Sequence, residues 1–193
     1  MQGKQKKQRR KPDRRIRRTH ERLGGALVQL IAEKPIDDIT VQEVLDRASV
    51  GRSTFYLHFR DKNDLLFSQL EMFLETMSTA LSRRKEKSLR VVPVEEMFEH
   101  IGGQNRIYRS LADSGRLADF YSLAQDYFAR GIEQRLKESN RLANVRQREL
   151  AFRACALAGS LLALLRWWIE RGAKESPREM DELFHRMVWS GRE

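Results

Sequence analysis

Residues 48–66, with the sequence ASVGRSTFYLHFRDKNDLL, combine hydrogen-bonding and aromatic side chains in a short span. Arginine, lysine, serine, threonine, tyrosine and histidine offer N–H and O–H donors, which suit phosphate oxygens and the polar edges of bases. The phenylalanines suit the inside of a small domain. The chemistry that this segment offers is therefore recognition of a partner, provided that its polar side chains face outward.

Other chemistries find less support in the sequence. The histidines His20, His58, His100 and His185 are widely separated and form no HxxxH or CxxC spacing, so we expect no metal site. Cys155 lies in an apolar helix and is expected to be a buried structural thiol. The chain has no glycine-rich phosphate loop, paired carboxylates or triad order in its second half. The sequence therefore predicts a non-enzyme without a cofactor.

The net charge of +10 is concentrated at one end of the chain. Residues 1–22 hold eleven lysines and arginines against Asp13 and Glu21, a net charge of +9, which leaves about +1 for the rest. A basic segment on a nearly neutral body is typical of a protein that binds a polyanion. The alternatives are a solubilising tail and an acidic membrane surface, but residues 1–13 hold no apolar residue beyond Met1 that could insert into a bilayer.

Helix signals dominate the first part of the chain. Apolar residues recur at helical spacing from about Arg14 to Lys34, and Pro35 ends the pattern. Thr40 and Glu43 form a capping-box pattern that predicts a short helix over about 41–48. The SVGR turn follows and then a second short helix, over roughly 52–58.

The second part of the chain also reads as helical. A long helix is predicted from Asp61 to about Ser82, followed by a charged break over 83–93. We expect five more helices, the last of which begins with a second capping box at Ser176 and Glu179. These helices are predicted over about 94–101, 105–113, 117–138, 146–171 and 177–189. The longest apolar run, 154–165, is shorter than the ~20 residues of a membrane span, and the single cysteine fits a reducing compartment, so we expect a cytoplasmic protein.

A helical projection separates the side chains of the second short helix. At 100° per residue, Phe55 and Phe59 fall on one face, which we expect to be the core. Ser53 and Leu57 fall on the opposite side, and Arg52 and Tyr56 lie along one edge. Two short helices joined by a glycine-containing turn form a helix-turn-helix arrangement.

The stretch ITVQEVLDRASVGRSTFYLHFRDKNDLL resembles the DNA-binding domain of TetR/AcrR-type transcriptional regulators. The resemblance covers about residues 13–73 and implies an all-α fold, in which a three-helix helix-turn-helix domain is joined through a long fourth helix to a C-terminal helical bundle that dimerises. Together with the basic segment and the charged break, it predicts a basic disordered arm (1–12), a DNA-binding domain (13–73, with its motif at about 40–59) and a regulatory and dimerisation domain (84–193).

The resemblance implies a set of DNA-contacting residues. Arg52 and Ser53 would read base edges, since an arginine can bond guanine O6 and N7 together. Phosphates would be contacted by hydroxyl, imidazole or ammonium groups. Leu57 departs from the family, which often has a polar residue there, and would meet a thymine methyl or simply be exposed. The full set is Thr40, Gly51, Arg52, Ser53, Thr54, Tyr56, Leu57, His58 and Lys62.

The second half resembles the C-terminal domain of one branch of the same family, in which the last two long helices form a four-helix dimer interface. The helix over 146–171 is apolar on nearly all sides, which favours burial between protomers. The expected interface residues are Ala151, Ala154, Ala158, Leu161, Leu165, Trp168, Leu183 and Met187. The resemblance also implies a small-molecule effector pocket, for which ordinary core packing is the alternative. Its candidate lining is Met97, Ile101, Tyr108, Phe120, Tyr127, Phe128 and Trp167.

These observations predict a homodimeric, sequence-specific transcriptional regulator, more often a repressor than an activator in this family. Its expected partners are a double-stranded DNA operator with an inverted repeat, a second copy of the chain and a possible small-molecule effector, with no membrane. The alternative is a ligand-independent accessory or architectural DNA-binding protein that relies on the basic arm.

Overall fold

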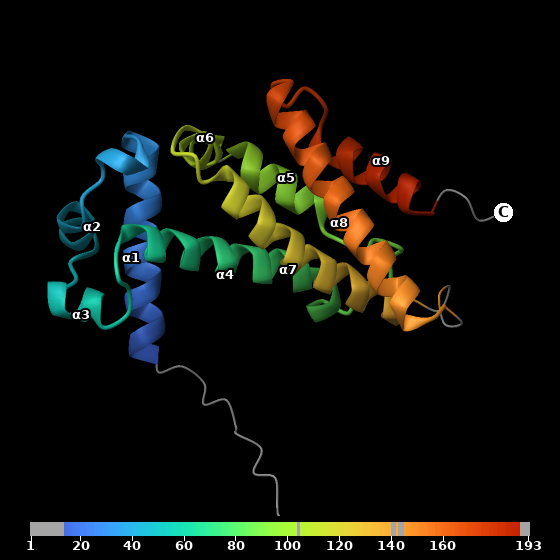
Figure 1. The fold of residues 1–193 in the computed structure, drawn as a ribbon, viewed down its shortest axis with the longest axis horizontal. Coiled ribbons are helices and arrows are strands. Elements are labelled where there is room, and N and C mark those ends of the chain that lie inside the picture. Colours follow the sequence, from blue (N-terminus) through green and yellow to red (C-terminus); the bar gives the residue numbers. More distant parts are fainter. Residues whose placement is uncertain (1–13, 104, 140–141, 143–144, 190–193) are drawn as a thin grey trace, which may run out of the picture. The chain divides into compact units, whose positions relative to one another are not determined.

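The computed structural model describes residues 14–103, 105–139, 142 and 145–189. Over these residues the chain forms nine α-helices and one short 3-10 helix but no strand, which confirms the all-α prediction (Figure 1). The predicted basic arm (1–12) lies outside the described residues. The helices are α1 (Arg14–Glu33), α2 (Val41–Ala48), α3 (Arg52–Tyr56), α4 (Lys62–Arg83), α5 (Val94–Gly103), α6 (Asn105–Asp113), α7 (Leu117–Glu138), α8 (Gln147–Glu170) and α9 (Pro177–Trp189), with the 3-10 helix at Ile36–Asp38.

The chain divides into two compact units between Leu66 and Phe67, inside α4. In the first unit, α1 packs on α2, and α2 packs on α3. From Leu23 onward, most apolar side chains of α1 recur every three or four residues and are buried, with Leu23 and Leu27 fully covered. Their burial removes apolar surface from water, which is the main force that holds these short helices together.

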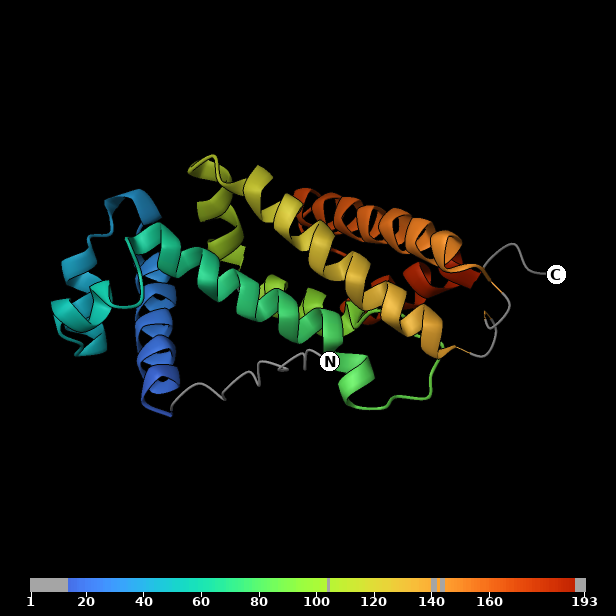
Figure 2. The same cartoon turned by 60° about the horizontal axis from the view of Figure 1, so that its bottom comes forward.

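In the second unit, the long helices α7 and α8 run side by side, and α5 packs on α9 (Figure 2). Phe98, Phe128 and Phe184 are fully buried in its core. The predicted capping box at the start of α9 is present, because Glu179 N–H donates to Ser176 Oγ and Ser176 N–H donates to Glu179 Oε2. These bonds satisfy backbone donors that a helix start leaves free.

Gly131 allows the backbones of α4 and α7 to come into direct contact in the second unit. A Cβ atom on Gly131 would lie 2.2 Å from the carbonyl oxygen of Ser78, a distance that no side chain can occupy. Even alanine therefore does not fit at this crossing without a shift of one helix.

An ionic cluster connects α9 to the segment before α5. Arg90 Nη2 donates to Asp181 Oδ1 at 2.7 Å, and the Glu95 backbone N–H donates to the same oxygen. Val91 N–H donates to His185 Nε2, so the imidazole proton is on Nδ1, which lies 3.1 Å from Asp181 Oδ2. Burial by itself raises the pKa of Asp181, but the hydrogen bonds from His185 and Arg90 outweigh it and lower that pKa.

The two faces of α8 differ from the prediction. Ala154, Ala158, Leu161, Leu165 and Trp168, which were expected at a dimer interface, are buried within the protomer and pack in its own core. The side chains that α8 exposes lie on its opposite side. We call the small and apolar members of this side, with the exposed Leu183 and Met187 of α9, the outer face, beside which the ion pair Arg166–Glu170 is also exposed: Ala151, Phe152, Cys155, Ala156, Gly159, Ala163, Trp167, Leu183 and Met187.

Cys155 belongs to this outer face and is exposed, so the expected burial of its thiol is wrong. A helix with apolar residues on nearly every side gives no sequence signal for which side faces its own core. The protomer uses Leu161, Leu165 and Trp168 for its own packing, and a different set of large and small side chains remains outside.

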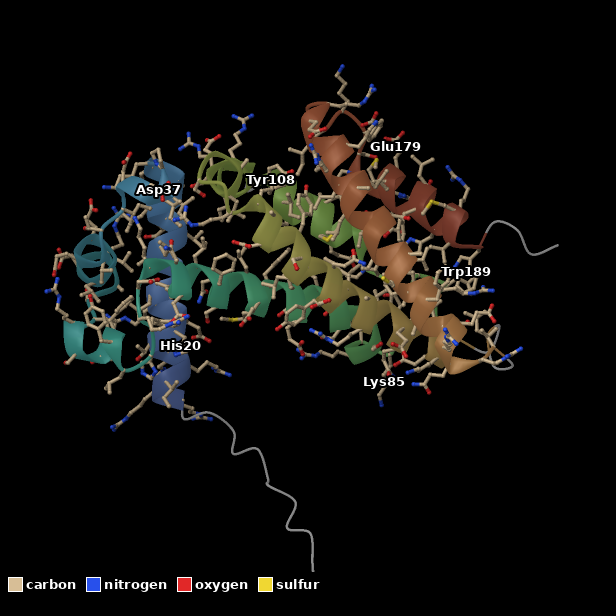
Figure 3. All side chains as sticks on the ribbon, in the orientation of Figure 1. His20, Asp37, Lys85, Tyr108, Glu179 and Trp189 are labelled. Atoms are coloured by element: carbon tan, nitrogen blue, oxygen red, sulfur yellow. The ribbon has the colours of Figure 1, made fainter. Side chains whose placement is uncertain are left out.

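The residues proposed for an effector pocket have several different surroundings in the described part of the chain. Met97, Phe120 and Phe128 are packed in the core, whereas Trp167 is exposed with Arg171 over its ring. Tyr108 on α6 forms a 2.7 Å hydrogen bond with the Tyr121 hydroxyl (Figure 3). Ile101 is buried as well, and Tyr127 borders a groove between α4 and α7.

Candidate nucleic-acid interface

The start of α2 is fixed by the predicted capping box. Glu43 N–H donates to Thr40 Oγ1 at 3.2 Å, and Thr40 N–H donates to Glu43 Oε2 at 2.8 Å. Lys34 from the end of α1 donates to the other oxygen of Glu43 at 2.7 Å. The hydrogen bond from Lys34, together with those from Thr40, lowers the pKa of Glu43 to about 2. The carboxylate therefore stays ionised and ties α2 to α1.

The turn between α2 and α3 depends on Ser49. Ser49 adopts the left-handed conformation with a φ of 50°, and its carbonyl accepts a 2.9 Å hydrogen bond from Arg22 Nη2 on α1. Gly51 has a φ of −69°, which any residue adopts, and a Cβ there would meet nothing within 4 Å. Gly51 is thus not required by the turn itself, and it leaves the backbone at the start of α3 open to a close partner.

The two sides of α3 are separated as predicted. Phe55 is fully buried and Phe59 is 4% exposed, with ring centroids 5.7 Å apart. Tyr56 and Leu57 are 53% and 80% exposed. Arg52 and Ser53 at the start of the helix are exposed as well. The phenylalanines hold α3 against its unit, and the opposite side is free of the rest of that unit.

The helix itself is shorter than predicted. It ends at Tyr56, and Leu57 and His58 follow in a turn in which His58 N–H and Phe59 N–H both donate to the carbonyl of Phe55. This tight turn lets Phe59 reach the core after only five helical residues.

A residue of α2 that sequence reasoning missed lies beside Arg52. Gln42 Oε1 accepts a long hydrogen bond of 3.4 Å from Arg52 Nη2, while Gln42 Nε2 donates to Asp46 Oδ1 at 2.8 Å. Asp46 thereby orients the Gln42 amide toward the arginine. The spacing of Gln42 and Asp46, four residues apart on a short helix, is the signal that could have identified the pair.

Lys62 has a different role from the one expected. Its Nζ donates to the carbonyl oxygens of Ile36, Asp37 and Ile39 at 2.6–2.8 Å. An ammonium group has three protons, so these bonds occupy all of them and the phosphate contact is not supported. Lys62 instead holds the segment before α2 against the start of α4. The Thr40 hydroxyl is likewise engaged, since it donates to Glu43 Oε2.

His58 is half-buried and packs against a second histidine. The rings of His58 and His20 of α1 are 4.9 Å apart between centroids, and His20 also lies 4.7 Å from the ring of Phe59. Thr54 is half-buried too. Figure 3 labels His20 on α1. Burial, and then the charge of a protonated His58, lower the pKa of His20.

The contact between His20 and His58 predicts that the fold becomes less stable as the pH falls. Because the folded state lowers the pKa of His20 below its unfolded value of 6.5, the unfolded chain binds the proton more readily as the pH falls. Burial also lowers the pKa of His100, which stacks on Phe73. We expect the free energy of unfolding to decrease from pH 7.5 to pH 5.5, and to decrease less steeply in His20→Phe. Urea unfolding at several pH values measures this, and identical slopes for the two proteins would contradict it.

Comparison with known proteins agrees with this geometry. The sequence profile of bacterial regulatory proteins of the tetR family matches residues 25–68, and that of a transcriptional regulator C-terminal region matches residues 93–189. The chain belongs to the TetR family of transcriptional regulators. It is thus a regulator with a DNA-binding helix-turn-helix, as the sequence predicted. TetR-family regulators are soluble cytoplasmic DNA-binding proteins and form a non-enzyme class.

Curated relatives of this TetR-family chain match it over part of their length. The uncharacterized HTH-type transcriptional regulator YerO of Bacillus subtilis (strain 168) is 28% identical over 93 residues, which are 48% of this chain and 32% of YerO. The uncharacterized regulator YxbF of the same organism is 35% identical over 60 residues, 31% of this chain and 16% of YxbF. The matches therefore span a third or less of either relative.

Solved structures of TetR-like fold cover nearly the whole chain. The dihydroxyacetone kinase operon activator DhaS has a TM-score of 0.67 at 15% identity, covering 88% of this chain and 93% of DhaS. A TetR transcriptional regulator from Streptococcus agalactiae 2603V has a TM-score of 0.59 at 23% identity, covering 91% and 96%. RolR in complex with resorcinol has a TM-score of 0.60 at 19% identity, covering 90% and 87%. At these identities the likeness concerns the fold alone.

One helix of this TetR-family chain also passes a test for membrane helices. By length and composition, α8 is apolar enough to cross a bilayer, although 33% of its most apolar window is buried within the protomer. The prediction from the sequence considered only the uninterrupted apolar run, 154–165. A window of 18 residues along α8 stays apolar on average even though it allows up to two charged residues. Core helices of soluble proteins pass the same test, so a single such helix does not indicate a membrane protein.

Proposed function

We propose that this chain is a sequence-specific repressor that binds an inverted-repeat operator as a homodimer. The observation that carries the proposal is the exposed side of α3, with Arg52, Ser53 and Tyr56 opposite the buried Phe55 and Phe59. A helix held by one side and polar on the other suits insertion into the major groove of DNA.

Each exposed side chain suggests a contact. Arg52 would bond O6 and N7 of a guanine, with Gln42 holding the guanidinium on its other side. Ser53 would reach an adjacent base edge, and the Tyr56 hydroxyl would bond a phosphate. Leu57 is too exposed to serve the core and suits a thymine methyl.

The outer face supports dimerisation. Phe152, Trp167, Leu183 and Met187 are large apolar side chains that are 39–73% exposed, and small residues lie between them on α8. A patch of this kind on a regulator suits a second copy of itself, packed helix on helix. A two-fold axis through it would present two copies of α3 to half-sites about one DNA turn, roughly 34 Å, apart.

Repression would follow from occupancy of the operator, since a dimer that fills two successive major grooves excludes other proteins from the same DNA. DhaS is named an operon activator and RolR was solved with resorcinol, so the fold accommodates activation and ligand binding in those proteins. Transcription from a promoter that carries the selected operator, measured with and without the protein, tests repression directly. Higher transcription with the protein would contradict it.

The function is tested most directly at Arg52. Selection of bound fragments from random DNA should yield an inverted repeat with a guanine at a fixed place in each half-site. Arg52→Ala should weaken binding to that operator by about 1–3 kcal/mol per half-site and relax the preference at that base pair. Titration of operator and scrambled duplexes by fluorescence anisotropy at fixed salt measures both effects.

A phosphate-only role for Arg52 would appear as an equal loss on the operator and on scrambled DNA. Arg60→Ala is the matched control, because Arg60 is exposed and pairs only weakly with Asp64 at 3.5 Å. It should leave the base preference unchanged. Selection that returns no common sequence would favour the architectural alternative.

A further inference from the structure

A cavity of about 660 Å³ opens in the second unit, away from the residues predicted to line an effector pocket. It lies between the α4–α5 segment and the C-terminal ends of α7 and α9. Its volume is in the range typical of sites for small organic ligands. Lys85, after α4, and Trp189, at the end of α9, are both labelled in Figure 3. Its lining includes Lys85, Lys87, Leu89, Arg135, Glu138 and Trp189.

The wall of the cavity is rigid because its polar groups hold one another. The buried Arg135 donates to the carbonyl oxygens of Ser88 and Arg90, and it pairs with Glu138 at 3.0 Å. The Trp189 indole N–H donates to the carbonyl of Leu89 at 2.9 Å. These bonds fix the segment before α5 to α7 and α9.

The acidic groups of the lining are already matched by partners, but two of the basic groups are not. Glu138 accepts from Arg135 and Ser82, and Glu86 lies 3.9 Å from Arg90. The ammonium groups of Lys85 and Lys87 are exposed and form no hydrogen bond or ion pair with the residues that the structure describes. The cavity therefore has an excess of positive charge at its rim.

Lys85 is held there in an unfavourable backbone conformation. Its φ is 52°, in the left-handed region, and it ends α4 in a Schellman motif in which Lys85 N–H bonds Ser82 O and Glu86 N–H bonds Leu81 O. Glycine adopts this conformation without steric cost, whereas a lysine does not. A strained residue at the rim of a cavity is a reason to look for a function of its side chain.

We infer that this cavity binds an organic anion. The acidic group would lie beside Lys85 and Lys87, and an apolar body would lie against Leu89, which is 45% exposed, and the Trp189 ring. The inference does not depend on DNA binding, since every lining residue belongs to the second unit.

The test uses the full-length protein and the fluorescent aromatic sulfonate 1-anilinonaphthalene-8-sulfonate. We expect saturable binding to the wild type and roughly tenfold weaker binding to the double variant Lys85→Gly, Lys87→Gln, a few-fold for each charge. Removal of the strained lysine should at the same time raise Tm by about 2–4 °C, so the loss of binding does not come from unfolding.

Ser49→Gly is the matched control, because Ser49 occupies the same left-handed position at the end of α2 and lies far from the cavity in sequence. It should raise Tm and leave sulfonate binding unchanged. Equal affinity of the double variant and the wild type would overturn the inference, as would no saturable binding to the wild type. Equally tight binding of the neutral analogue N-phenyl-1-naphthylamine would also overturn it.

Discussion

Replacing Asp181 by alanine should lower the free energy of unfolding by about 1–3 kcal/mol: the Arg90 guanidinium keeps Glu96 as a partner, but its Nε and the Glu95 backbone N–H lose their acceptor. Asp181 is 8% exposed and accepts hydrogen bonds from Arg90 and from the Glu95 backbone N–H. The Nδ1 proton of His185 is shared between this carboxylate, at 3.1 Å, and the backbone carbonyl of Asp181, at 2.8 Å. No other described side chain takes the place of Asp181 on the Nε of Arg90.

Urea unfolding followed by circular dichroism, at one fixed protein concentration, measures the loss. Glu182→Ala is the control, since Glu182 is exposed and forms only a surface pair with Arg178, and it should change stability by less than about 0.5 kcal/mol. A loss below about 1 kcal/mol in Asp181→Ala would show that Arg90 finds another partner. The double variant Arg90→Met, Asp181→Leu should recover part of the stability, because the buried guanidinium is removed together with the Asp181 carboxylate and Glu96 keeps its pair with Arg84.

The helices of this chain could be predicted closely because their signals are local. α7 and α9 match the predicted ranges, 117–138 and 177–189, and both capping boxes are present. Phe55 and Phe59 were both placed correctly in the core, although only Phe55 lies in α3 and Phe59 follows in the turn after it. Caps and periodicity depend on residues within one or two turns, which is the range that a sequence displays.

What the sequence did not predict depends on contacts between distant segments. Lys62 looked free for phosphate, but three carbonyls from the segment before α2 take its protons. The close approach of Gly131 to Ser78 joins residues 53 positions apart, and the pairing of Arg90 with Asp181 joins residues 91 apart. α8 is apolar on most sides, so its periodicity did not distinguish the core side from the outer face.

The outer face is where we expect substitutions to have the largest effect on operator binding. Ala156 and Ala163 are exposed and seven residues apart on the same side of α8, between the large side chains of Phe152 and Trp167. The double variant Ala156→Glu, Ala163→Glu would place four carboxylates at a two-fold interface, where they would be buried without partners. Glutamate is a good helix former, so the protomer itself should stay folded.

We expect this variant to sediment as a 22.7 kDa monomer and to bind the full operator about 10²–10⁴ times more weakly, because each half-site is then bound by an independent monomer. Its affinity for a single half-site should stay close to that of the wild type. Ala118→Glu on α7, also exposed, should remain dimeric.

Ala158→Glu separates the two assignments of the interface. Since Ala158 is fully buried, this variant should lose its fold rather than only its partner. A folded monomeric Ala158→Glu together with a dimeric Ala156→Glu, Ala163→Glu would place the interface on the buried side and refute the outer face.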